Sequence, residues 1–490
     1  MNTIDSSLSP RDASPSRGPS RAVKAEDHAL GRVPESWRKS GWELSKSTVG
    51  IATALVIFAI GGFAVILSGF TWGLVAGGAV AVLGAVLSIL VGRISYAEGV
   101  SATVASRFYG FGFKGSSLAT VIFGFMILGF LALENALLYE GTLLMFSWQD
   151  TWATRILLYG LMSVAWILLA VFGMNLALRS SMFLTATTVL LATYTIWALY
   201  FQGDARFADV FSTAGAVPGG AWPKFEAAFA LMGGTAGTIA LLIADFARYA
   251  KSQKDVVILG VVGPIAQNFL MVVAGALVIV GGLPAVASFL MARDSGLDAQ
   301  AAAAAASGFA MGNTGAFFVV ATSWLGFVTI YAAQAKAQVI NTYSGSLSLS
   351  NLVDVLGNKR PGRVVMVVLG NIIALLMIGA GILQHFSSYL GYLGAMTLSF
   401  VGVMIADFYW VRRGERADAR AENVNWAGIV SVMLASAAGI WLIATGVMPL
   451  GFMVSLAIAF ALYPGLRLSV LPEGRFTTYQ TESRSLQEAI

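Results

Sequence analysis

The sequence contains no cysteine and few charged residues, and both features narrow what the protein can be. Charged residues make up 11% of its 490 residues, whereas a soluble domain carries about 25%. The absence of cysteine excludes disulfides and thiolate metal sites. The two histidines, His28 and His385, stand far apart, and we expect no histidine cluster, metal site or cofactor. Because no nucleophile–base pair and no paired carboxylates stand out either, the sequence argues against an enzyme.

Long apolar runs account for most of the chain. The composition is 57% hydrophobic, with 54 glycines and a mean hydropathy of +0.77. A membrane span needs about 20 mostly apolar residues, and in lipid its backbone groups must be hydrogen-bonded internally, as in a helix. We therefore predict an all-α polytopic membrane protein with twelve transmembrane helices. The predicted spans are residues 47–69, 72–92, 117–146, 154–173, 180–201, 227–248, 256–281, 316–342, 363–384, 387–410, 426–445 and 449–467.

The basic residues sort to one side of these predicted spans. With the N-terminus placed inside, 25 of the 30 Lys and Arg residues fall in cytoplasmic segments. Four fall outside, namely Arg155, Arg206, Lys224 and Arg293. The excess of basic residues on the cytoplasmic side predicts a plasma-membrane protein with both termini in the cytoplasm. Lys336 is the one basic residue that this sorting leaves deep inside a span.

The two ends of the chain differ from the rest in composition. Residues 1–40 are rich in Ser, Pro, Arg and Asp and show no apolar periodicity, so we predict a disordered cytoplasmic tail. This start is polar, and we expect no cleavable signal peptide. Residues 41–467 form the predicted transmembrane domain, and residues 468–490 form a short cytoplasmic C-tail.

Two glycine clusters interrupt long apolar runs five spans apart. Gly61 and Gly62 stand in the first predicted span, and Gly233 to Thr238 stand in the sixth. This spacing is typical of inverted five-helix repeats whose broken helices bind substrate and ion with freed backbone groups. Gly61 and Gly62 are thus candidates for the ion site, and Gly234 and Thr235 for the substrate site. The alternative is close helix packing through small residues.

Two ionisable residues lie deep in the predicted spans, where a charge costs a few kcal/mol or more. Glu134 shares a helix face with Phe130, Leu137 and Gly141. An aromatic ring, a carboxylate and a small residue on one face suit a planar ligand that forms hydrogen bonds. The alternative for Glu134 is a structural salt bridge or a protonated carboxyl group in the core.

The eighth predicted span carries Lys336 together with several side-chain amides. Gln334, Gln338 and Asn341 follow one helix face, and amides can donate and accept hydrogen bonds to a heterocycle. Lys336 points about 160° away from Gln338 on a helical wheel. It is either a permanent ion-pair partner, for example of Glu134, or a group that carries the coupled charge.

Two similar stretches, IADFARYAK and IADFYWVRR, end the sixth and tenth predicted spans on the cytoplasmic side. Each places an aspartate, Asp245 or Asp407, a few residues before an arginine such as Arg248. We interpret these residues as interfacial anchors or gate salt bridges rather than substrate ligands.

Four stretches resemble the nucleobase–cation symport family, the purine–cytosine permeases. They are VPESWRKSGWEL before the first span, ASRFYGFGFKGS before the third, IADFARYAK, and NTYSGSLSLSN after the eighth. The resemblance runs from about Val33 to Arg416. It implies the leucine-transporter fold, in which spans 1–5 and 6–10 are inverted repeats with broken helices 1 and 6. The repeats would cover about 47–201 and 227–410, and two C-terminal helices, about 426–467, would follow.

The resemblance also implies a substrate site. The aromatic and polar positions of the family's third span correspond to Phe130 and Glu134. The polar positions of the eighth span correspond to Gln338, Asn341 and Thr342. In the sixth span, Thr238 stands where cytosine permeases have a serine.

This sequence departs from the family pattern at two places. Ala236 stands where members often have a Trp or Phe that stacks on the base. Lys336 stands where sodium-dependent members have a Ser or Thr that binds the ion, and Ala337 takes the next ligand's place. An ammonium there would repel sodium strongly, so we hypothesise that Lys336 replaces the ion against the carbonyls of Ile60 to Phe63. It would then carry the coupled proton, with Glu134 as partner.

The sequence therefore predicts a secondary active transporter that imports a nucleobase or related small N-heterocycle by proton symport. Its expected partners are the substrate, the coupling proton and the lipid bilayer, without nucleic acid. The alternatives are sodium-coupled symport, and an amino-acid or amine/vitamin-precursor transporter of the same fold.

Overall fold

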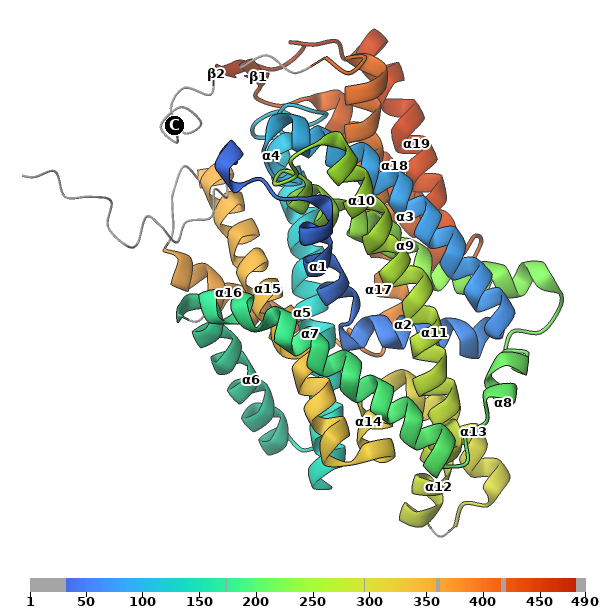
Figure 1. Ribbon diagram of the computed structural model, residues 1–490. Helices are drawn as coiled ribbons and strands as arrows, with labels where there is room; N and C mark the ends of the chain where they lie inside the picture. The colour runs from blue at the N-terminus through green and yellow to red at the C-terminus, as the bar shows by residue number, and fades with distance from the viewer. Residues whose placement is uncertain (1–31, 173, 295, 358–361, 416–419, 482–490) are drawn as a thin grey trace, which may run out of the picture.

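The computed structural model describes residues 32–481 except 173, 295, 358–361 and 416–419. Within these residues the chain is almost entirely helical, which confirms the predicted all-α class (Figure 1). One small antiparallel sheet pairs β1 (Arg420–Glu422) with β2 (Tyr479–Thr481), with Ala421 opposite Gln480. Most of the predicted N-terminal tail, residues 1–31, lies outside the described residues, as do residues 482–490.

The helices of the first half follow the predicted spans. The first span is bent by 67° at Thr53 and Ala54. Its two parts and the following helices are α1 (Gly41–Ala52), α2 (Leu55–Ser68), α3 (Phe70–Glu98), α5 (Ser116–Phe146), α6 (Trp152–Phe172), and α7 (Met174–Trp197) with the π-helical η3 (Ala198–Gln202). The short α4 (Ala102–Ala105) and α8 (Phe207–Ser212) connect them.

The second half contains the remaining spans. Its main helices are α9 (Ala221–Ala247), α10 (Gln253–Pro264), α12 (Gly281–Arg293), α14 (Thr314–Thr322), α15 (Trp324–Gly357), α16 (Arg363–Gly379), α17 (Phe386–Ile405), α18 (Trp426–Ala444) and α19 (Gly451–Gly465). Shorter segments join or extend them: η4 (Ile265–Leu270), α11 (Met271–Gly275), η5 (Ala276–Val280), α13 (Ala299–Gly312), η6 (Ala406–Val411) and η7 (Leu466–Val470). The predicted eighth span divides at Ser323, whose φ is 51°.

The apolar character of these helices fits a membrane protein. In the described part of the chain, nine helices are long and apolar enough to cross a membrane, or ten if the bent pair α1–α2 counts as one span. The other two predicted spans are also helical: α16 is a shorter apolar helix, and α15 carries Lys336 and its neighbouring amides. This arrangement is consistent with the predicted twelve spans.

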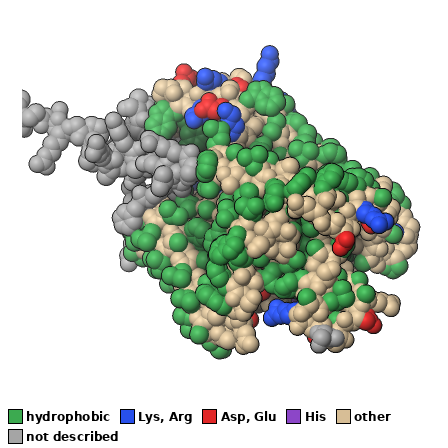
Figure 2. All heavy atoms as spheres, turned by 60° about the horizontal axis from the view of Figure 1, so that its bottom comes forward, with side chains coloured by type: hydrophobic (Ala, Val, Ile, Leu, Met, Phe, Trp, Pro, Cys, Tyr) green, Lys and Arg blue, Asp and Glu red, His purple; other side chains and the backbone are tan. Residues whose placement is uncertain are grey.

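The centre of the molecule is formed by α5 and α17 (Figure 1). On one side α17 packs against α9, α18 and α19, and α9 packs along α3. On the other side α5 pairs with α15, which contacts α7 and α16. Figure 2 shows that charged side chains form only a few patches on the face drawn, while hydrophobic side chains are spread over much of it.

Residues 32–40, which the sequence analysis assigned to the disordered tail, are ordered. The 3-10 helix η2 (Glu35–Trp37) precedes Lys39, whose N–H donates to the Tyr249 carbonyl over 2.7 Å. Lys251 N–H donates back to the Lys39 carbonyl, and Gly41 N–H donates to Asp255 Oδ1. This segment therefore links the start of α1 to the connection between α9 and α10.

Candidate functional site

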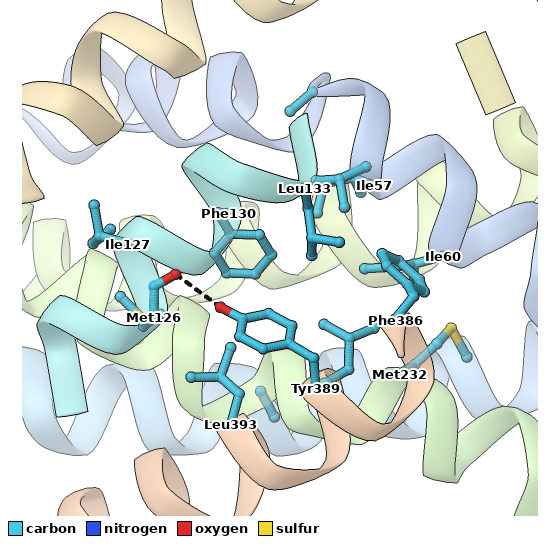
Figure 3. Close-up of a cluster of buried hydrophobic side chains, with 14 of the residues drawn as sticks. Ile57, Ile60, Met126, Ile127, Phe130, Leu133, Met232, Phe386, Tyr389 and Leu393 are labelled. Carbon is cyan, nitrogen blue, oxygen red and sulfur yellow. Dashed lines mark hydrogen bonds between the residues drawn. The ribbon is translucent and has the colours of Figure 1, made fainter. Parts of the chain in front are cut away.

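Phe130 and Glu134 lie on the face of α5 that meets α17. The hydroxyl of Tyr389 on α17 donates to the Met126 carbonyl over 3.0 Å, and its ring meets Phe130 edge to face at 6.2 Å (Figure 3). Gly129 makes this approach possible, because a Cβ there would lie 2.0 Å from the Tyr389 hydroxyl oxygen. The two rings thus form an aromatic pair one turn from Glu134.

Apolar side chains from α2, α9 and α17 surround this aromatic pair. Figure 3 shows Ile57 and Ile60 of α2, Met232 of α9 and Phe386 of α17 gathered around Phe130 and Tyr389. All of them are buried. The face of α2 that carries Ile57 and Ile60 therefore closes over the aromatic residues of α5 and α17.

Glu134 is a buried carboxylate whose recorded hydrogen-bond partner is an amide of α15. Only 3% of Glu134 is exposed, and Asn341 Nδ2 donates to its Oε2 over 3.1 Å. The structure thus joins two of the predicted substrate residues directly. A buried carboxylate beside an amide can accept hydrogen bonds from a ligand with adjacent N–H groups.

The other amides of α15 have separate partners. Gln338 Nε2 donates to Asn135 Oδ1 over 2.7 Å and to the Leu131 carbonyl, and Trp166 Nε1 of α6 donates to the same Asn135 oxygen. Gln338 therefore belongs to a buried network joining α5, α6 and α15. Gln338 Oε1 and Thr342 Oγ1 are buried and have no hydrogen-bond partner among the described residues.

The break in the first span lies between α1 and α2, and α15 contacts it through two side chains. Gln334 Oε1 accepts a hydrogen bond from the N–H of Leu55, the first residue of α2. The ammonium of Lys336 donates to Thr53 Oγ1 at the break and to Thr185 Oγ1 of α7, the latter over 3.1 Å. Lys336, of which 3% is exposed, thus connects three elements at one point.

The ammonium of Lys336 has other hydrogen-bond partners than the sequence suggested. It donates to Thr53 and Thr185, and no hydrogen bond of the described residues joins it to the carbonyls of Ile60 to Phe63, which lie inside α2. Nor is Lys336 in an ion pair with Glu134, since no carboxylate of the described residues lies within 4.0 Å of its ammonium.

Gly61 and Gly62 lie inside α2 and serve packing rather than a break. A Cβ on Gly61 would lie 2.3 Å from the Met271 carbonyl oxygen, and one on Gly62 would lie 2.5 Å from Ile279. The seventh span therefore approaches the backbone of α2 directly. Their proposed role in the ion site has no support from these contacts.

The second glycine cluster does not interrupt its helix either, because α9 is continuous from Ala221 to Ala247. A Cβ on Gly233 would collide with Phe452 of α19, and one on Gly237 with Thr397 of α17. Close helix packing, the alternative interpretation of the cluster, is what the structure contains. The predicted break in the sixth span is therefore wrong for this structure.

The candidate substrate residues of α9 face other helices. Thr235 Oγ1 donates to Asn268 Oδ1 of η4 over 2.6 Å, and Thr238 Oγ1 donates to the Gly234 carbonyl of its own helix. Ala236 packs toward Gly84 of α3. No recorded hydrogen bond or ring contact of the described residues joins these side chains to Phe130 or Glu134, whereas Met232, which the sequence analysis did not select, reaches the apolar cluster.

Gly234 provides a test of the packing interpretation. A Cβ at this position would lie 2.2 Å from the Leu390 carbonyl oxygen of α17. We expect Gly234→Ala to lower the free energy of unfolding by about 1–3 kcal/mol, because α9 and α17 must separate. Thermal unfolding of the purified protein measures this change. In the matched control, Gly220→Ala, nothing lies within 4 Å of the new methyl group; equal melting temperatures for the two variants would contradict the interpretation.

Asp245 and Asp407 lie at the ends of their spans. Asp245 Oδ1 accepts from the N–H of Ala102, the first residue of α4, and Arg248 Nε donates to the Asp245 carbonyl. Asp407 is fully buried, and it accepts from Tyr463 over 2.8 Å and from Arg412 over 3.3 Å. These contacts fix helix ends to their neighbours, and a gating role for the same residues is a proposal.

The sequence analysis missed four residues of this region: Thr53, Asn135, Thr185 and Tyr389. One signal was available for Tyr389, because a glycine directly before Phe130 indicates that a neighbouring group approaches α5 closely. The two threonines carry no such signal, since isolated hydroxyl residues are common in apolar helices.

Known proteins with similar sequences are permeases. The model of a family described as "Permease for cytosine/purines, uracil, thiamine, allantoin" matches residues 32–461. The cytosine permease of Escherichia coli (strain K12) is 26% identical over 375 residues, which is 75% of this chain and 78% of that protein.

Solved structures with a similar fold are also transporters. The inward-facing conformation of Mhp1 is 16% identical, with a TM-score of 0.69 over 91% of this chain and 94% of that one. A substrate-bound, outward-open Na⁺-coupled sialic acid symporter is 13% identical, with a TM-score of 0.61 over 90% and 91% of the two chains.

Proposed function

The chain belongs to the family of permeases for cytosine/purines, uracil, thiamine and allantoin, and on this basis we propose that it imports a nucleobase or related small N-heterocycle with a proton. The protein is a multi-pass secondary transporter rather than an enzyme. Its fold is the predicted leucine-transporter fold, shared with Mhp1. The proposed direction is into the cell across the plasma membrane, with both termini in the cytoplasm.

The aromatic and polar residues around Glu134 support a heterocyclic substrate. Phe130 and Tyr389 offer ring surfaces, and Glu134 with Asn341 offers a carboxylate and an amide; Phe130, Tyr389 and Glu134 are buried, and Asn341 is partly buried. An aromatic base has a flat face for the rings and N–H groups for the carboxylate. In this proposal Gln338 and Thr342 take part through their unpartnered oxygens. The described contacts of Gly234, Thr235, Ala236 and Thr238 give no support to their direct role.

The proposal of proton coupling rests on the position of Lys336. Its ammonium lies at the break of the first span and is bonded to Thr53 and Thr185. A cation at this point connects α1 and α2 with α15 and α7. It can therefore hold α1–α2 against α15 and α7. We propose that the ammonium does this in place of sodium.

The coupled step is the release of one proton from the Lys336 ammonium to water on the cytoplasmic side once the site opens inward, which leaves a neutral amine. A hydrogen bond to a charged group contributes about 1.5–3 kcal/mol, so the amine holds Thr53 and Thr185 less strongly and α1–α2 can move against α15. Glu134, a buried carboxyl group on α5, is the proposed partner of this exchange. Reprotonation of the amine from the outside completes the cycle.

Uptake into proteoliposomes tests the proposed function. We expect accumulation of at least one of radiolabelled cytosine, adenine, guanine and uracil under an imposed pH gradient, without a requirement for sodium. An excess of unlabelled amino acids should not compete. Uptake driven by sodium alone would contradict the proposed coupling, and transport of amino acids but of no base would contradict the proposed substrate.

A further inference from the structure

A groove lies beside the ends of α17 and α19, away from the candidate substrate site. Its volume is about 560 Å³, and its lining residues are Tyr409, Trp410, Val411, Arg413, Phe460 and Leu468. Three of these residues belong to the π-helical η6 and one to the π-helical η7. These π-helical segments are the C-terminal ends of α17 and α19, and both border the groove.

The walls of the groove are apolar and partly uncovered. Trp410 is 53% exposed and Leu468 is 66% exposed. The rings of Trp410 and Phe460 lie 5.5 Å apart and form one wall. In a transmembrane protein such an uncovered apolar wall lies against lipid, and a tryptophan is typical of the membrane–water interface.

Arg413 supplies a positive charge at this groove. In the described part of the chain its guanidinium takes part in no hydrogen bond or ion pair. Its φ of 53° is uncommon for a residue with a side chain. The preceding Arg412 bonds to the buried Asp407, so the two consecutive arginines have different surroundings: one is paired inside and the other is exposed.

A neighbouring arginine, unlike Arg413, also has its charge paired. Arg467, next to Leu468, is buried and forms ion pairs with Glu422 over 2.8 Å and with Glu473 over 3.4 Å, so its charge is neutralised. Arg413 is therefore the arginine of the groove lining whose charge has no ion-pair partner among the described residues, and it stands beside apolar walls at the predicted cytoplasmic interface.

We propose that this groove binds one anionic glycerophospholipid of the inner leaflet. An acyl chain lies between Trp410, Phe460 and Leu468, and the headgroup phosphate lies at Arg413. Basic sites between transmembrane helices on the cytoplasmic side are suited to anionic headgroups. A zwitterionic lipid fits less well, because its own cation competes with the arginine for the phosphate.

Native mass spectrometry of the full-length protein in detergent tests the proposal, with phosphatidylglycerol and phosphatidylcholine as probes. We expect one phosphatidylglycerol to be retained about fivefold more strongly than phosphatidylcholine, and Arg413→Gln to remove this preference. Trp410→Ala should weaken binding of both lipids. Lys254→Gln, which removes an exposed charge from the same predicted side, should leave the preference unchanged.

Several results would overturn the proposal. One is equal retention of the two lipids by the unmodified protein, and another is an equal loss of preference in Arg413→Gln and Lys254→Gln. Displacement of the phosphatidylglycerol by millimolar inorganic phosphate would show a phosphate site without a lipid groove. The melting temperature of each variant is measured alongside, so that a folding defect is distinguished from lost binding.

Discussion

Lys336→Ala abolishes accumulation driven by a pH gradient while leaving substrate exchange across the membrane in place. This is the expected result if the ammonium at Thr53 and Thr185 carries the coupled charge. A gradient of about one pH unit is worth about 1.4 kcal/mol per proton, or roughly tenfold accumulation for one proton per substrate. Loss of coupling therefore lowers the accumulation ratio about tenfold, toward one, in a proteoliposome uptake assay.

One further variant separates the charge of Lys336 from its proton, and a second variant is the control. Lys336→Arg keeps a cation that does not lose its proton in proteins, so we expect exchange without driven accumulation. Lys114→Ala removes an exposed lysine far from the site and should behave as the unmodified protein. Undiminished accumulation in Lys336→Ala would show that Lys336 has a structural role and would contradict the coupling mechanism.

Glu134→Gln is expected to raise the substrate concentration for half-maximal uptake by about tenfold or more. The buried carboxylate would lose charged hydrogen bonds worth about 1.5–3 kcal/mol, both to Asn341 and to the substrate's N–H groups. Dose-dependent uptake of the transported base measures the change. Glu140→Gln, six residues further along α5 and partly exposed, is the matched control.

A double-mutant cycle tests whether Glu134 and Asn341 bind the substrate at one site. If both side chains hold the same substrate edge, Asn341→Ala adds little to Glu134→Gln, because residues in contact are not additive. Fully additive effects, or an unchanged half-maximal concentration in Glu134→Gln, would refute the assignment of this pair to the substrate.

The fold was predictable because the apolar runs are long and the chain carries few charges. Spans such as α3 and α5 follow from hydropathy alone, since about 20 apolar residues in lipid must be helical. Similarly, Phe130 and Glu134 share a face because helical periodicity requires it. The contact of Glu134 with Asn341 was not predicted, because several amides lie on α5 and α15 and helical periodicity does not choose among them.

The position of the helix break was not predictable from glycine. Thr53 and Ala54 are ordinary residues in an apolar run. The backbone N–H of Leu55, just after the break, donates a hydrogen bond to Gln334, which is 279 positions further along the sequence. Gly61 and Gly234 instead allow neighbouring backbones to approach. Because glycine permits both a bend and a close contact, the sequence alone left two interpretations open, and tertiary contacts decided between them.

The most direct test of the account is proton movement itself. The protein is reconstituted into sodium-free proteoliposomes that contain a pH-sensitive dye, and the transported base is added outside without an imposed gradient. The account predicts that the interior acidifies as the base enters, and that Lys336→Ala and Lys336→Arg show no such change. Base entry without acidification in the unmodified protein, or acidification that persists in Lys336→Ala, would contradict the claim that Lys336 carries the coupled proton.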